Sequence, residues 1–343
     1  MRYKLLGRSG LRVSELGLGT MTFGEDWGWG ASREESRRIF EAYADAGGNF
    51  IDTANRYTDG TSERFVGEFV APDREHFVVA TKYTLFNREG DPNAAGNHRK
   101  NMVQSLEASL KRLGTDYVDL LWLHAWDFMT PVDEVMRGLD DLVRAGKVLY
   151  LGISDTPAWV VSQANTLADL RGWSPFVALQ IEYSLIQRTP ERELLPMARS
   201  LDLAVTPWGI LGSGALTGKY NRAQPPKEGR VKEGRGQDPE VLEVGAEVVS
   251  VAEEVGCTPT QVAVSWLRHQ PGLLIPLLGA RTLDQLQDNL KVLDVTLSPQ
   301  HLERLDESTR VDLGFPHEFL AREHIRNLTH AGCWEKIDNH RRG

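Results

Sequence analysis

The chain has 343 residues, of which 41% are hydrophobic and 25% are charged. That composition is typical of a folded globular protein and excludes a disordered or fibrous chain. Lys and Arg total 39 against 48 Asp and Glu, so the formal net charge is -9, spread without long blocks of one sign. Such a balance argues against nucleic acid or an anionic membrane as partner and makes small molecules the expected partners.

The first ten residues contain no hydrophobic signal core, and no apolar run reaches the roughly 18 residues that a membrane span requires. The two cysteines, Cys257 and Cys333, have no companion Cys or His at metal spacing. The sequence therefore predicts neither a disulfide framework nor a metal site. We expect a cytoplasmic protein in a reducing compartment.

The chain begins with a predicted β-hairpin, in which 3–6 pairs with 11–13 around the turn Arg8-Ser9-Gly10. Short runs rich in Val, Ile and Leu then recur, each too short for a helix. They predict eight strands, at 16–20, 49–53, 77–82, 118–124, 148–154, 177–183, 203–208 and 273–279.

Between these strands, apolar residues at three- and four-residue spacing predict amphipathic helices at 33–46, 99–113, 131–145 and 259–269. Ser32 and Glu35 have the spacing of a capping box at the start of the first helix. A further helix is predicted at 239–255, and Ser298-Pro299 begins another one in a tail that then becomes irregular.

Strands that alternate with helices predict parallel pairing with right-handed crossovers. Eight such units favour a closed α/β barrel, the (β/α)8 TIM barrel, over an open doubly wound sheet. We expect a single domain over 1–343, with the hairpin plugging the barrel floor. The segment 212–236, rich in Gly, Pro, Lys and Arg, predicts a long loop over the C-terminal mouth.

Polar residues end several predicted strands, at the edge where barrel active sites form. Asp52 ends the second strand, Lys82 the third and His124 the fourth. An ammonium group that follows an apolar strand needs a carboxylate, and Asp52 on the neighbouring strand supplies one. Because a nearby ammonium favours the phenolate, we expect Lys82 to lower the pKa of Tyr57 from about 10 and make this residue a general acid.

A phenol that can give up its proton, beside an imidazole N–H, suits protonation of a carbonyl oxygen. No side chain can supply a hydride, so this chemistry implies a nicotinamide cofactor. A desolvated Lys82 also meets the requirement of a Schiff-base aldolase, and that alternative stays open.

Five segments resemble the aldo-keto reductases and occur in that family's order. They are Leu18-Gly19-Thr20-Met21, Phe50-Ile51-Asp52-Thr53-Ala54 with Tyr57, Ala80-Thr81-Lys82, Leu123-His124-Ala125-Trp126-Asp127 and 275–289. The resemblance implies NADP(H)-dependent reduction of an aldehyde or ketone. It also implies that Tyr57 donates the proton, that Lys82 and Asp52 adjust the pKa of Tyr57, and that His124 orients the carbonyl group. Because potassium-channel β subunits resemble this family too, a redox-sensing regulatory subunit is a second hypothesis.

The resemblance implies cofactor contacts as well. Residues matching Ser154 and Gln180 hold the nicotinamide carboxamide in the family, and an aromatic residue at the Trp208 position stacks on the ring. The implied set is Gly19, Thr20, Met21, Asp52, Ser154, Gln180, Trp208, Leu211, Ser213, Lys219, Gly279, Arg281, Gln285, Asp288 and Asn289. Arg281, beside a helix start, suits the 2′-phosphate of NADP. Asp155 stands where many relatives have Asn, and an ionised acid accepts but does not donate.

Aromatic residues just beyond strand ends predict the walls of a pocket for a bulky or aromatic carbonyl compound. They are Trp27, Trp29, Phe86, Trp126 and Phe128. Packing of loops on the barrel explains these residues equally well. Arg56, Arg88 and Asp127 nearby would instead favour a polar or charged carbonyl compound, and the sequence leaves both open.

Overall fold

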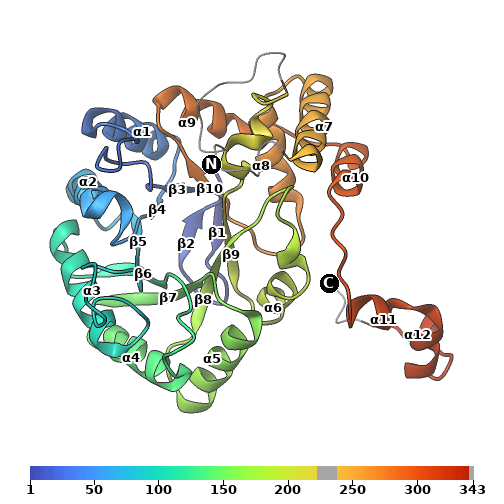
Figure 1. Ribbon diagram of the computed structural model, residues 1–343, viewed down its shortest axis with the longest axis horizontal. Helices are drawn as coiled ribbons and strands as arrows, with labels where there is room; N and C mark the ends of the chain where they lie inside the picture. The colour runs from blue at the N-terminus through green and yellow to red at the C-terminus, as the bar shows by residue number, and fades with distance from the viewer. Residues whose placement is uncertain (222–237, 340–343) are drawn as a thin grey trace.

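The computed structural model describes residues 1–221 and 238–339, and an eight-stranded parallel barrel is its centre (Figure 1). The strands are β3 Gly17–Gly19, β4 Phe50–Asp52, β5 Val78–Tyr83, β6 Val118–Leu123, β7 Val148–Ser154, β8 Phe176–Glu182, β9 Ala204–Trp208 and β10 Leu277–Gly279. They follow one another around the barrel from β10 and β3 to β9. An isolated bridge between Val205 of β9 and Leu274, just before β10, closes the barrel. The predicted (β/α)8 barrel is confirmed, and every predicted strand overlaps an observed one.

Helices cover the outside of the barrel. They are α1 Arg33–Asp45, α2 Thr61–Val70, α3 Arg99–Leu113, α4 Val132–Arg144, α5 Ala158–Arg171, α6 Leu194–Ser200, α7 Pro239–Val255, α8 Pro259–His269, α9 Leu283–Leu290 and α10 Pro299–Ser308. The five helices predicted before residue 270 are confirmed, whereas α2, α5, α6 and α9 lie outside the predicted ranges. Within the described ranges, no helix is both long and apolar enough to cross a membrane.

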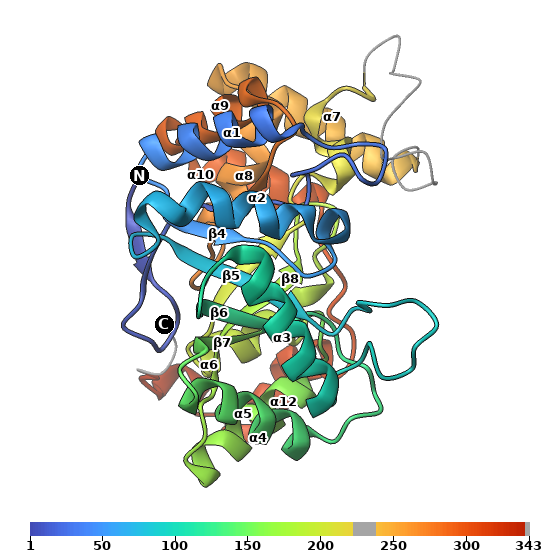
Figure 2. The same ribbon diagram turned by 90° about the vertical axis from the view of Figure 1, so that its left-hand side faces the viewer.

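The N-terminal hairpin closes one end of the barrel. Its strands, β1 Tyr3–Leu5 and β2 Arg12–Ser14, pair antiparallel as predicted. Leu6 and Val13 are fully buried in the apolar cluster of the barrel interior. Gly7, at φ 57, lies so close to β8 that a Cβ would meet a backbone oxygen at 2.2 Å. The hairpin therefore plugs the floor, and Figure 2 shows it opposite the long loops that follow β5 and β6.

Alternation along each strand separates the barrel interior from the layer beneath the helices. In β6, Leu120 and Trp122 belong to the interior cluster, whereas Leu121 belongs to the larger cluster under the helices. Trp122 is fully buried against Gly152 of β7, where a Cβ would lie 2.2 Å from the indole ring. Apolar side chains thus fill the lower barrel, and polar inward positions begin near the carboxyl ends of the strands.

One predicted helix cap is only half formed. Ser32 Oγ accepts from the Glu35 backbone N–H at 3.2 Å, as a capping box requires. The Glu35 carboxylate, however, accepts from the backbone N–H of Leu283, the first residue of α9, at 2.6 Å. A carboxylate at a helix N-terminus is favourable in either place. Glu35 therefore links α1 to α9, a contact between helices that are remote in sequence.

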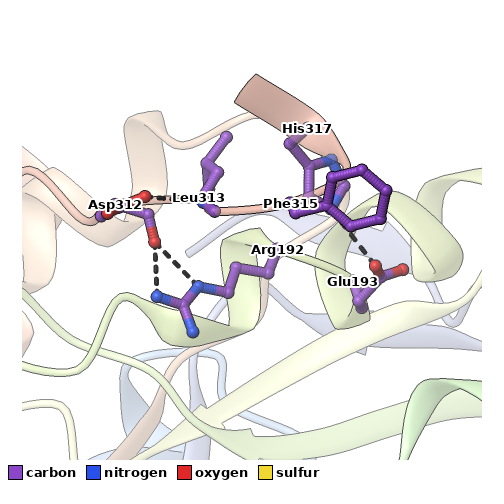
Figure 3. A pocket seen from close by; sticks show the side chains of 7 residues that line it. Arg192, Glu193, Asp312, Leu313, Phe315 and His317 are labelled. Atoms are coloured by element: carbon purple, nitrogen blue, oxygen red, sulfur yellow. Dashed lines mark hydrogen bonds and ion pairs between the residues drawn. The ribbon is translucent and has the colours of Figure 1, made fainter. Parts of the chain in front are cut away.

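The tail contains more helix than its sequence predicts. Two short helices, α11 His317–Ala321 and α12 Glu323–Thr329, follow α10 and project from the barrel in Figure 1. A pocket of about 340 Å³ lies at the base of this segment, beside the residues that precede α6 (Figure 3). There Arg192 Nε donates to the Asp312 carbonyl oxygen at 2.9 Å. This pocket lies outside the barrel, away from the predicted site.

Candidate active site

Strand register brings the predicted polar residues to one end of the barrel. Asp52 ends β4, Lys82 lies near the end of β5, and Ser154 of β7 pairs with Gln180 of β8. Gln180 in turn pairs with Thr206 of β9. These five side chains are at most 3% exposed. The carboxyl ends of the strands therefore carry a buried polar layer above the apolar interior.

Lys82 is the centre of this layer. Its Nζ donates to Asp52 Oδ2 at 2.5 Å, to the Thr53 carbonyl oxygen at 2.9 Å and to the Tyr57 hydroxyl oxygen at 3.1 Å. Burial lowers the pKa of Lys82, but the charges of Asp52 and Tyr57 and the hydrogen bonds to them together raise it further, so the pKa is raised overall. An ammonium that keeps its charge and donates three hydrogen bonds is not the neutral nucleophile of a Schiff-base aldolase.

Tyr57 begins the turn Tyr57–Gly60, which follows β4. Burial raises the pKa of Tyr57 above its ordinary value, and the charge of Lys82 opposes the rise without cancelling it. The prediction that Lys82 lowers the pKa of Tyr57 overall is therefore wrong, because desolvation of the phenolate outweighs the attraction of the ammonium. The phenol stays protonated at neutral pH, as a proton donor must, and Lys82 remains within reach of the oxygen.

His124 follows β6, and its ring meets that of Tyr57 edge to face, with centroids 6.1 Å apart. Burial, and then the charge of Lys82, lower the pKa of His124 to about 3. The imidazole is therefore neutral near pH 7 and carries one N–H. Its Nδ1 atom is buried and has no hydrogen-bond partner among the described residues. A neutral imidazole in this position can make a hydrogen bond to a substrate oxygen near Tyr57.

Gln180 and Ser154 lie side by side at the strand ends, and Gln180 contacts the carboxylate of Asp52. Its Nε2 donates to Asp52 Oδ1 at 3.0 Å and so helps to orient that carboxylate. The buried hydroxyls of Ser154 and Thr206 have no partner within the part of the chain that the structure describes. Such groups are uncommon in proteins and are open to a ligand. Sequence reasoning missed Thr206, although its spacing two residues before Trp208 marks an inward position.

The first strand contributes mainly backbone. Gly19 ends β3, and the Thr20 hydroxyl donates to the carbonyl oxygen of Asp52 at 2.9 Å. Met21 is half-buried in the loop that follows. Thr20 therefore ties this loop to the strand that carries the aspartate.

The predicted loop over the mouth is described only as far as residue 221, and the rest of 212–236 lies outside the described residues. It starts with the turn Gly212–Thr217, directly after Leu211. Ser213 is exposed at φ 56, and Lys219 Nζ lies 4.9 Å from the ring centroid of Tyr220.

The other predicted cofactor residues lie around the start of α9. Arg281 is exposed two residues before this helix, and its backbone N–H donates to Gln285 Oε1 at 2.9 Å. Asn289 Nδ2 donates to the carbonyl oxygen of Gly279 at 3.4 Å. Arg281 therefore lies just before a helix N-terminus, and the Gln285 side chain fixes its backbone.

Asp288 has a role that the sequence does not reveal. Its carboxylate accepts from the Thr258 hydroxyl at 3.0 Å and from Gln261 Nε2 at 2.8 Å. Both donors belong to the capping box at the start of α8. Asp288 thus joins α9 to α8, and this contact is structural.

The predicted aromatic wall divides into separate groups. The rings of Trp27 and Trp29 lie 5.7 Å apart, and Trp126 packs against the core cluster beneath the helices. Phe128 is 70% exposed. The Arg56 guanidinium carbon lies 4.5 Å from the ring centroid of Phe86.

The charged residues offered as alternative substrate contacts already have partners. Arg56 forms an ion pair with Asp59, and Arg88 forms one with Asp91. Asp127 connects two loops at the mouth, because its Oδ2 accepts from the Asn97 backbone N–H at 2.7 Å. Its own backbone N–H donates to Asn97 Oδ1 at 2.7 Å.

Comparison with known proteins agrees with this geometry. The pattern of the Aldo/keto reductase family matches residues 15–310. The chain belongs to the aldo/keto reductase family. It is 38% identical to norsolorinic acid reductase of Aspergillus flavus, over 98% of this chain and 89% of the relative. It is 37% identical to the NADP(+) aryl-alcohol dehydrogenase of Phanerodontia chrysosporium, over 95% of this chain and 91% of the relative. The protein is therefore an oxidoreductase of the aldo/keto reductase family, as the sequence predicts.

Proposed function

We propose that this aldo/keto reductase reduces an aldehyde or ketone to the alcohol, with Tyr57 as proton donor and NADPH as cofactor. The observation that carries the proposal is the 3.1 Å hydrogen bond between Lys82 Nζ and the Tyr57 hydroxyl at the barrel mouth. Asp52 lies on the other side of the ammonium group.

The residues at the mouth control one proton. Tyr57 holds it at neutral pH because burial raises the pKa of the phenol. When the phenol gives the proton to a carbonyl oxygen, Lys82 stabilises the phenolate, and Asp52 keeps Lys82 charged. Neutral His124 makes a hydrogen bond to the same oxygen and so orients the carbonyl group.

The mouth fits a nicotinamide cofactor. The hydroxyls of Ser154 and Thr206, which have no partner in the described part of the chain, complement a carboxamide, and Trp208, 36% exposed at the end of β9, offers a ring face. When bound, NADPH supplies the hydride that the side chains do not. The printed name of the Phanerodontia relative, which includes NADP(+), supports the same cofactor.

Tyr57→Phe tests the assignment of the proton donor. We expect turnover to fall by about 10²- to 10⁴-fold, the usual contribution of a general acid, while the Kd for NADPH changes by less than about twofold. Tyr3→Phe is the matched control, since it removes a phenol hydroxyl at the opposite end of the barrel, where Tyr3 donates to Gly47. Steady-state kinetics and quenching of protein fluorescence by NADPH measure the two quantities. Turnover of Tyr57→Phe within tenfold of wild type would reject the assignment.

Arg281 is proposed to bind the 2′-phosphate of NADPH. Arg281→Ala should raise the KM for NADPH by about tenfold and change the KM for NADH by less than about twofold, because only NADPH carries the phosphate. An equal rise for both cofactors would contradict this role.

An aryl carbonyl compound is the proposed substrate class. The support is the printed name of the Phanerodontia relative, which specifies an aryl alcohol. Loss of NADPH absorbance with matched aromatic and aliphatic aldehydes tests the class, and a preference for the aliphatic members would overturn it.

A further inference from the structure

A hydrogen bond connects two strand ends at the mouth and has no part in the proton transfer proposed above. Asp155 directly follows β7, and Trp208 is the last residue of β9. The indole Nε1 of Trp208 donates to Asp155 Oδ1 at 3.2 Å. The bond therefore spans the intervening strand β8 and joins two loops that begin on either side of it.

The backbone holds Asp155 in place for this contact. Its φ of 41 is in the left-handed region, which Asp tolerates better than most residues do. Its N–H donates to the carbonyl oxygen of Gln180 at 3.2 Å, and its own carbonyl oxygen accepts from the Trp126 N–H at 3.4 Å. Trp208, by contrast, is 36% exposed, so packing alone does not fix its ring.

We propose that Asp155 is a positioning residue, which holds the indole ring of Trp208 in one orientation at the mouth through its carboxylate. The inference rests on the proposed function in one respect, namely that a nicotinamide ring is to face Trp208. The hydrogen bond between Trp208 and Asp155, called the tether below, exists in the free protein and can be tested there.

The charge of Asp155 makes the tether sensitive to pH. Desolvation raises the pKa of Asp155 to about 6, and the charge of Glu182 adds to the rise, whereas the Trp208 hydrogen bond, the charge of Lys82 and the neighbouring Ser154 hydroxyl oppose it. Asp155 in turn raises the pKa of Tyr57. A hydrogen bond to an ionised acceptor is stronger than one to a neutral acceptor, so the tether weakens as Asp155 becomes protonated below about pH 6.

Indole resonances of the free protein report on the tether directly. Each of the nine tryptophans gives one indole cross-peak in a ¹⁵N–¹H spectrum, and Trp208→Phe identifies the peak of Trp208. We expect this peak to shift between pH 5 and 7.5 with a midpoint near 6. Asp155→Asn keeps an acceptor without a charge and should abolish the titration. Asp202→Asn is the control, because Asp202 is another aspartate with positive φ and lies before β9 at the floor, away from Trp208.

Kinetics then separate positioning from a merely structural role. Asp155→Ala should raise the KM for NADPH by about fivefold at pH 7.5, the effect of one lost hydrogen bond, with a smaller change in kcat. Asp155→Asn should restore most of this affinity but show no dependence of KM on pH near 6. A Trp208 peak that is stationary in wild type, or that still titrates in Asp155→Asn, overturns the proposal. If the peak titrates as expected but no carbonyl compound is reduced, the proposed function fails and the tether stands.

Discussion

Both ends of the barrel hold a buried carboxylate beside a cation, but with different neighbours. At the floor, Glu15 accepts from Arg268 at 2.8 Å and from a backbone N–H at 2.7 Å, so the acid and base serve the structure. At the mouth, Lys82 bonds to Asp52 and also to the hydroxyl of Tyr57. A buried carboxylate paired with a cation therefore does not by itself identify an active site. An active site is indicated where the cation also bonds to a group that can exchange a proton.

Lys82→Met should have the largest effect of the changes that separate the two ends. Turnover is expected to fall by about 10²- to 10⁴-fold, because the phenolate of Tyr57 loses the group that stabilises it. The uncompensated Asp52 should also lower the free energy of unfolding by about 3–5 kcal/mol. Steady-state kinetics and denaturant unfolding measure these losses.

The double variant Asp52→Asn/Lys82→Met sharpens this prediction. It removes the unpaired charge and should recover part of the lost stability but none of the turnover. Recovery of turnover would mean that the mouth pair only neutralises charge, as the floor pair does.

Arg268→Met is the counterpart at the floor, and its effect should be on stability alone. The free energy of unfolding should fall by about 3 kcal/mol, with kcat/KM unchanged within about twofold. Burial raises the pKa of Glu15, but its hydrogen bonds from Arg2 and Arg268 and the charges of Arg268 and Lys4 together lower the pKa further.

The sign of the pH dependence at the floor follows from that lowered pKa. A carboxyl whose pKa is lowered on folding adds stability above its unfolded value of about 4.3 and loses it as the pH falls through the folded value. Wild type should therefore lose stability more steeply below about pH 5 than Arg268→Met does. Unfolding curves at pH 7, 5 and 4 measure the difference, and parallel slopes would contradict it.

Asp127→Ala should have the smallest effect, because Asp127 bonds to loop residues at the mouth, among them Asn97 and Thr130, and to none of the proton-transfer residues. We expect the KM for the carbonyl substrate to rise by about threefold to tenfold while kcat changes less, since the loops lose hydrogen bonds worth about 1 kcal/mol each. Asp127→Asn should fall between wild type and Asp127→Ala. A fall in kcat as large as that of Lys82→Met would place Asp127 in the chemistry itself.

The sequence predicts the contact between Asp52 and Lys82 because neighbouring parallel strands end at the same edge, and strand order follows chain order here. It does not correctly predict whether the pKa of Tyr57 is raised or lowered, because that shift depends on how deeply the loops bury the phenol. Burial of a loop residue is a property of the whole fold, whereas a charged neighbour can be inferred from spacing.

Contacts between remote helices are hidden from the sequence for the same reason. Glu35 fits a local capping box, yet its carboxylate caps α9. Asp288 fits a cofactor site by resemblance, yet it bonds to the cap of α8. In both cases the local pattern identifies a carboxylate near a helix start. Only the packing of helices around the barrel determines with which helix that carboxylate forms its hydrogen bonds.

The short pairing between β9 and the segment that leads into β10 affects how fast backbone amides of the barrel exchange with solvent. Among the described residues, two backbone hydrogen bonds flank the bridge at Val205, at 2.8 Å each, to Leu273 and from Ile275. Other neighbouring strands are joined by longer ladders, as between β8 and β9. Deuterium should therefore reach the amides of Val205 and Ile275 before those of β6 and β7. Val205 is the second residue of β9, at the end of the strand away from Trp208, so we expect local opening of the cylinder to begin nearer the floor than the mouth.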